Sequence, residues 1–130
     1  MNYLDIYIHH ALTGFCDDIS VNYNGKKKKG IELSLYVTEG TVSKLDGFEQ
    51  ISENKDNYLC IIDSYVGQEC IFENAILTKA ALIGFANADP LQLKKDIEDV
   101  YSVIHVCDEN GTDMIYDHVN TDIIETWWNR

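Results

Sequence analysis

The 130-residue sequence has few basic residues and a single proline. It contains 10 Lys+Arg against 22 Asp+Glu, which gives a net charge of −12. Nucleic acids and anionic membranes are themselves negative, so this charge argues against both as main direct partners. No Pro-, Gly- or Ser-rich linker divides the sequence, and its length is common for one domain. We therefore expect a single globular domain over residues 1–130.

The short motifs of common enzymes are also missing. The sequence contains no G-x-S-x-G, H-E-x-x-H, G-x-x-x-x-G-K-[ST] or G-x-G-x-x-G, the signatures of many hydrolases, zinc proteases and nucleotide-binding folds. Its four cysteines, at positions 16, 60, 70 and 107, form no C-x-x-C pair, so neither a zinc ribbon nor a thioredoxin-type site is predicted. We expect reduced structural thiols and no cofactor, and a non-enzymatic role is favoured.

A secretory leader and a long hydrophobic run are absent as well. The N-terminal residues lack a basic cluster, and Asp5 interrupts their apolar run, which is unlike a signal peptide. The longest mainly apolar stretch covers 14 residues, 75–88, whereas a helix needs about 20 to span a bilayer. These features predict a cytoplasmic protein with no membrane partner.

Alternation of apolar and polar residues predicts strands along the first half of the chain. Period-two alternation, typical of half-buried strands, occurs over residues 3–8, 19–23 and 31–37. The Gly-bounded lysine loop between the last two predicts that they form a hairpin. A run that is apolar on both sides predicts a further strand over 58–66, central in the sheet.

Two helices are predicted in the middle of the chain. Apolar residues surround nearly the whole helical circumference over 71–86, which is typical of a buried helix. A second, amphipathic helix is predicted over 89–101. It begins with Asp89 and Pro90, because Asp is a good N-cap and Pro suits the first helical position.

The C-terminal third predicts a hairpin and a last short helix. Asn110-Gly111 is the preferred core of a tight hairpin turn, here between strands at 103–107 and 114–119, and residues 121–128 predict the helix. Together the elements predict an α+β fold. Its mostly antiparallel sheet of about five to six strands packs against two helices, with the C-terminal hairpin and the terminal helix added.

The predicted hairpin offers one candidate chemical site. With a two-residue turn, His105, Cys107 and His118 share a face, and the two imidazoles are diagonal neighbours about 7–8 Å apart. These side chains suit a metal ion or Cys/His chemistry, so one hypothesis is a small metal-assisted or Cys/His enzyme. The same register opposes Asp108 to Asp113. This like-charge pair favours a longer turn, which would change the pairing and leave an ordinary polar-aromatic face.

Negative charge is concentrated in the last quarter of the sequence. From residue 96 onward there are nine acidic residues and one basic residue, with Tyr and Trp interleaved. Aromatic side chains are enriched at interface hot spots, and complementary charge accelerates association. A solvated acidic surface is the simpler alternative. The residues predicted to bind a partner are Asp96, Asp99, Tyr101, Asp113, Tyr116, Asp117, Asp122, Glu125, Trp127 and Trp128.

The partner predicted by such a face is a basic protein. Nucleases are basic because their substrate grooves must attract phosphate. The leading hypothesis is therefore a protein inhibitor, an immunity protein that occludes a cognate bacterial toxin, expected to be a nuclease. A second hypothesis is a phage-encoded inhibitor of a host defence complex that acts as an acidic nucleic-acid mimic.

Overall fold

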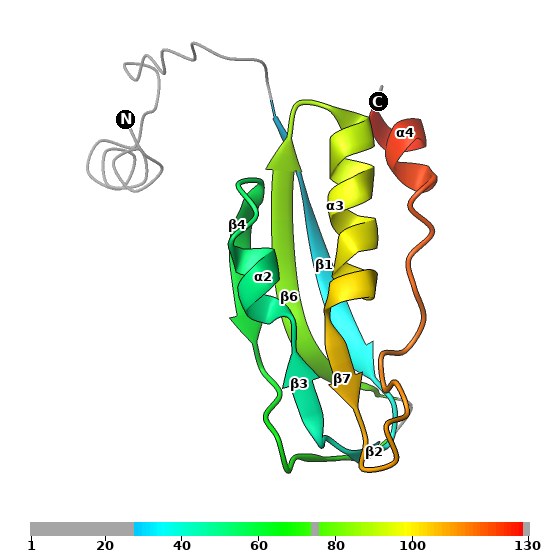
Figure 1. The fold of residues 1–130 in the computed structure, drawn as a ribbon. Helices are drawn as coiled ribbons and strands as arrows, with labels where there is room; N and C mark the ends of the chain where they lie inside the picture. Colours follow the sequence, from blue (N-terminus) through cyan, green and yellow to red (C-terminus); the bar gives the residue numbers. More distant parts are fainter. Residues whose placement is uncertain (1–27, 74–75, 129–130) are drawn as a thin grey trace, which may run out of the picture.

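A computed structural model describes residues 28–73 and 76–128 of the chain (Figure 1). The elements follow in the order β1 (Lys29–Val37), β2 (Gly40–Thr41), β3 (Lys44–Asp46), α2 (Phe48–Ser52), β4 (Asn57–Ile62), β5 (Glu69–Cys70), β6 (Thr78–Asn87), α3 (Pro90–Val103), β7 (His105–Cys107) and α4 (Ile123–Trp128). The predicted α+β class is confirmed, and α3 is the one long helix among those described.

A three-stranded antiparallel sheet in the order β1-β6-β4 forms the body of the molecule. Helices α2 and α3 lie on the same side of this sheet, and α4 lies beside the start of α3 (Figure 1). The remaining described strands form two short pairs, β2 with β5 and β3 with β7. The prediction of five to six strands in one sheet is therefore only approximate.

The core lies between the sheet and α3. The predicted alternation over residues 31–37 is confirmed, because Leu33, Leu35 and Val37 are buried while Glu32 and Tyr36 are exposed. Leu33, Leu35 and Val37 belong to the same buried cluster as the apolar stripe of α3, which follows the expected helical spacing. The largest fully buried apolar side chains are Phe85, Leu35, Ile83, Leu93, Ile97, Ile104, Met114, Val37, Val42, Val100 and Val106.

The predicted helix over residues 71–86 is wrong. Most of this segment belongs to β6, which pairs with β1 on one side and β4 on the other. A central strand buries side chains on both of its faces, so the period-two alternation that marks a strand is lost. Gly84 is the residue in this segment that favours a strand over a helix. Its missing Cβ leaves room for the Tyr58 ring, which lies 2.7 Å from where a Cβ would stand. Glycine inside a strand often marks such a close approach.

The helix predicted over residues 89–101 is confirmed as α3, which continues to Val103. The Asp89 carboxylate accepts a hydrogen bond from the N–H of Leu91 at 3.0 Å, and Pro90 is the first helical residue. The N-terminal cap therefore forms as the sequence pattern indicates. The predicted terminal helix is also present, as α4.

Other strand predictions differ in position or extent. The strand predicted over 58–66 is β4, but it ends at Ile62 and lies at an edge of the three-stranded sheet. The predicted strands at 3–8 and 19–23, with the hairpin of the latter to 31–37, lie outside the described residues. In residues 28–73 and 76–128, none of the helices has the length and apolar character needed to cross a membrane.

Two phenylalanines provide a test of this fold. Phe85 is 0 % exposed in β6, so Phe85→Ala should lower the free energy of unfolding by about 3–5 kcal/mol through lost burial and a cavity. Phe72 is 49 % exposed, and Phe72→Ala should lower it by less than about 1 kcal/mol. Urea unfolding of the two variants measures both values. Equal losses would contradict the placement of Phe85 in the core and Phe72 at the surface.

Candidate partner-binding surface

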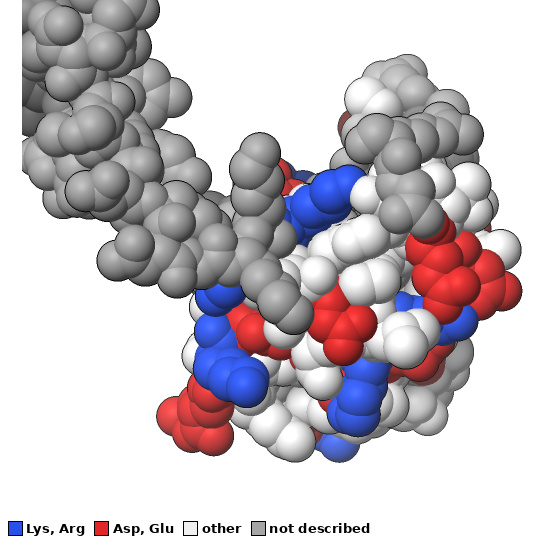
Figure 2. Space-filling model, turned by 90° about the horizontal axis from the view of Figure 1, so that it is seen from above, with Lys and Arg blue, Asp and Glu red and all other residues white. Residues whose placement is uncertain are grey.

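Most of the described lysines lie at one end of the sheet. Lys28, Lys29, Lys55, Lys94 and Lys95 lie in or next to elements at the α4 end (Figures 1 and 2). Viewed from above in Figure 2, lysine and carboxylate side chains are interspersed on this end. The α4 end therefore carries charges of both signs.

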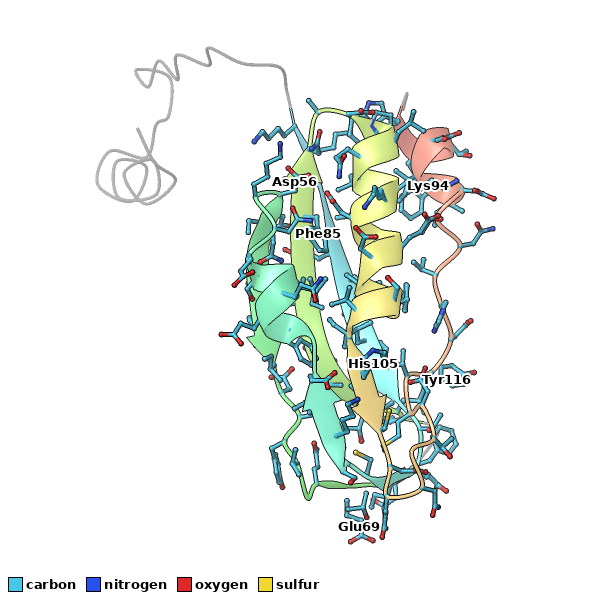
Figure 3. All side chains as sticks on the ribbon, in the orientation of Figure 1. Asp56, Glu69, Phe85, Lys94, His105 and Tyr116 are labelled. Carbon is cyan, nitrogen blue, oxygen red and sulfur yellow. The ribbon has the colours of Figure 1, made fainter. Side chains whose placement is uncertain are left out.

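The opposite end of the sheet is acidic. The lysines described there are Lys44 and Lys79, and each lies next to an aspartate, with Nζ–Oδ2 distances of 3.4 Å to Asp46 and 3.6 Å to Asp63. Glu69 and Tyr116 mark this end in Figure 3. Further carboxylates come from the end of β1, from β5 and from the turn after β7. We call the surface formed by Glu39, Glu69, Glu73, Asp108, Glu109, Asp113 and Asp117 the acidic end.

Aromatic rings are exposed between these carboxylates. Phe72 is 49 % and Tyr116 is 55 % exposed. The N–H of Tyr116 donates to the carbonyl of Tyr36 at 2.8 Å, which joins the C-terminal segment to β1. The N–H of Phe72 donates to Oε1 of Glu39 at 3.2 Å, which joins the segment after β5 to the same place. Three segments far apart in the sequence thus meet at one surface.

The turn after β7 is held by its own first residue. Oδ1 of Asp108 accepts hydrogen bonds from the N–H groups of Asn110 (2.9 Å) and Thr112 (3.0 Å). Cys107 pairs with Asp113 rather than with Met114, so the turn is longer than the predicted two residues. The longer turn avoids the opposition of two aspartates that the shorter one requires.

The predicted His105, Cys107 and His118 site does not assemble. The longer turn changes the register, and β7 pairs with β3, where His105 lies opposite Asp46. His118 instead stacks on the Tyr101 ring of α3, with centroids 4.2 Å apart. Across the described parts of the chain, no group of three or more His, Cys, Asp or Glu side chains is placed to hold a metal ion.

The residues predicted to bind a partner are divided between the two ends. Asp113, Tyr116 and Asp117 belong to the acidic end. At the other end lie Asp122, Glu125, Trp127 and Trp128. There Lys94 pairs with Asp122 at 2.6 Å, and Nζ of Lys29 lies 5.2 Å from the centroid of the Trp128 ring. Residues that are neighbours in sequence therefore do not form one acidic face.

Two further predicted residues, Tyr101 and Asp99, make contacts within the described structure. The Tyr101 hydroxyl accepts a hydrogen bond from the N–H of Val119 at 3.1 Å. Together with the stacked His118 ring, this contact holds the segment that leads to α4 against α3. Asp99 pairs with Lys95 one turn earlier in α3, at 2.7 Å. Such exposed pairs contribute little to stability.

Asp96 is not a surface residue, which corrects its predicted role in partner binding. It is 1 % exposed, and Oδ1 accepts hydrogen bonds from Asn54 (3.0 Å) and Gln92 (2.9 Å). The nearby Asp56 is also buried, and Oδ2 of Asp56 accepts from Asn87 at 2.8 Å. The two aspartates form a buried pair between α3, the end of β6 and the loop before β4.

The two carboxyls of this pair titrate differently. Burial, followed by the hydrogen bond with Asp56, raises the pKa of Asp96. Burial also acts to raise the pKa of Asp56, but hydrogen bonds with Asp96 and Asn87 and the charges of nearby lysines outweigh it, so this pKa is lowered. Two adjacent buried carboxyls avoid like-charge repulsion by sharing one proton. Because its pKa is raised while that of Asp56 is lowered, Asp96 keeps its proton to a higher pH than Asp56 does.

Asp96→Asn tests the shared proton. Because the folded state raises the pKa of Asp96, it binds more protons than the unfolded state above the ordinary value of 3.8, and stability falls as pH rises through that window. An amide donates to Asp56 without titrating. The free energy of unfolding of the variant should therefore increase relative to that of wild type as pH rises from about 4. The difference between the two should then become constant.

Urea unfolding between about pH 3 and pH 8 measures this difference. Asp99→Asn is the matched control in the same helix, because Asp99 is more exposed and pairs with a lysine. A difference between Asp96→Asn and wild type that does not change with pH would contradict the shared proton.

The sequence does not single out Glu39 or Phe72. Phe72 falls within the segment predicted as a helix, and Glu39 follows a strand in a region without a motif. The available signal is local: Ile71 and Phe72 are flanked by Glu69 and Glu73, so large apolar side chains stand among charges. An apolar group rimmed by polar residues is typical of an interaction surface.

Comparison with protein-family models, curated proteins and solved structures finds no match to this chain. The interpretation of the acidic end therefore depends on its own chemistry. Exposed aromatic rings among carboxylates are suited to recognising cationic groups.

Proposed function

We propose that the chain is a protein inhibitor that acts by binding, an immunity protein that occludes a basic cognate bacterial toxin. A nuclease is the expected target. The observation that supports this proposal is the acidic end, where exposed Phe72 and Tyr116 stand among carboxylates from three segments. A basic substrate groove is complementary to such a surface in both charge and apolar character.

In this mechanism the carboxylates and the aromatic rings have different tasks. The carboxylates attract the basic groove and accelerate encounter, as complementary charges do across other interfaces. Individual exposed ion pairs stabilise a complex by only about 0.2–1 kcal/mol. Most of the affinity is therefore assigned to burial of the rings, the kind of side chain that dominates interface hot spots. Occlusion of the groove then blocks access of nucleic acid.

The nucleic-acid mimic is the alternative in the same class. A mimic needs carboxylates in a regular array near the phosphate spacing, which strand residues on one face supply about every 7 Å. The carboxylates of the acidic end come instead from turns and strand ends in separate segments. This irregular arrangement favours occlusion of a basic groove by charge and apolar contact over imitation of the regular phosphate array of a duplex.

The test of this function uses the protein encoded next to this chain in its source genome, since toxin and immunity proteins must be produced together. We expect the two purified proteins to form a tight complex. Raising salt from about 50 to 500 mM should slow association by about tenfold or more, because screening removes the steering charge. Co-expression should protect cells from the toxin. Absence of both binding and protection would contradict the proposal.

Charge reversal locates the surface within that complex. Glu69→Lys and Glu109→Lys at the acidic end should each slow association by about threefold to tenfold, with smaller effects on dissociation. Neither side chain takes part in a described hydrogen bond or ion pair, so the fold should be unaffected. Glu53→Lys, with the same change of charge after α2, is the matched control. Equal slowing by all three would mean that only net charge matters and would contradict a localised face.

A further inference from the structure

We infer that a depression between Phe72 and Tyr116 receives an arginine side chain of the basic partner. This inference rests on the proposed function and names the group that the acidic end recognises. The depression has a volume of about 390 Å³ and is lined by Thr38, Glu39, Phe72, Leu77 and Tyr116.

The size and position of the depression suit a single protruding side chain. Sites for drug-sized ligands are enclosed and have volumes of about 300–1,000 Å³. This site is at the lower end of that range and opens to solvent beside two half-exposed rings. A long side chain can enter it while the rest of the partner remains on the rim.

Its chemistry is that of a site for a planar cation. Glu39 supplies the only ionisable carboxylate among the five lining residues. Its Oε1 accepts the N–H of Phe72, so the carboxylate is held at the rim of the depression. Phe72 and Tyr116 add two aromatic rings, and arginine both stacks on aromatic faces and pairs with carboxylates in a bidentate manner. Lysine offers only a point charge and is less suited.

Two other occupants fit less well. A second copy of this chain carries the same net charge of −12, and contact between two acidic ends would bring like charges together. A purely apolar peptide would cover Phe72 and Leu77 but would bury the Glu39 carboxylate without a counter-charge, which is costly. An arginine can stack on the aromatic rings and pair with the Glu39 carboxylate at the same time.

The experiment titrates the full chain with N-acetyl-arginine amide and, in parallel, with N-acetyl-citrulline amide at constant ionic strength. Citrulline has nearly the same shape but no charge. In ¹H–¹⁵N NMR spectra we expect the backbone amides of Glu39, Phe72 and Tyr116 to shift about fivefold more with arginine than with citrulline at equal concentration. Equal shifts with the two ligands would overturn the inference.

Charge-only variants make the assignment specific. Glu39→Gln keeps an oxygen that accepts the Phe72 N–H, so it should remove most of the arginine response without disturbing the fold. Glu69→Gln is the control, because Glu69 lies at the acidic end but does not line the depression. Tyr116→Leu, which keeps apolar bulk without a ring, should also reduce the response. If Glu39→Gln leaves the arginine shifts unchanged, the inference is wrong.

Failure of this inference can be distinguished from failure of the proposed function. Arginine-specific shifts in the absence of any complex with the neighbouring protein would support the depression and contradict the immunity role alone. A tight complex that is unaffected by Glu39→Gln, with equal responses to arginine and citrulline, would contradict the depression alone.

Discussion

The pairing of β6 with two partners at once is the constraint on which the rest of the structure depends. Its register against β1 places Phe85 opposite Ile31 and Ile83 opposite Leu33, and its other edge pairs with β4. One face of these strands forms one side of the core, and α3 lies on the other side. The same register sets where β1 ends. Residues 36–39, which include the last two of β1, join both residues 114–116 and Phe72. The central strand therefore positions the acidic end, although none of the carboxylates that define this end belongs to β6.

A buried polar pair completes this arrangement at the other end of the strand. Asp56 lies before β4, its hydrogen-bond donor Asn87 ends β6, and Asp96 lies on the buried side of α3. Burial of two adjacent carboxyls would be strongly unfavourable if both were ionised, because their like charges would repel each other at short range. The amides of Asn54 and Gln92 donate to Oδ1 of Asp96, and the amide of Asn87 donates to Oδ2 of Asp56, so the pair connects three elements. The Asp56–Asp96 pair fixes the position of α3 on the sheet, and it makes the stability of the fold depend on pH.

The sequence was sufficient where local chemistry decides the structure and insufficient where tertiary contacts do. The α3 cap at Asp89 and the alternation in β1 are local, and both were predicted. The central strand was not, because burial on both faces makes its pattern resemble that of a buried helix. For the surface, three of the predicted residues, Asp113, Tyr116 and Asp117, lie at the acidic end, whereas sequence proximity wrongly grouped them with α4. Contacts between distant segments, such as the one between Glu39 and Phe72, leave no recognisable pattern in the linear sequence.

Net charge and local charge therefore carry different information about this molecule. A value of −12 disfavours anionic partners wherever the charges lie. It does not define a binding face, because at the α4 end the carboxylates alternate with most of the described lysines and Lys94 is already paired with Asp122. At the acidic end, the described lysines lie beside Asp46 and Asp63, which leaves the carboxylates around Phe72 and Tyr116 uncompensated by them. Recognition of a cation needs this local excess together with apolar surface to bury, and the fold brings the two together at one end of the sheet.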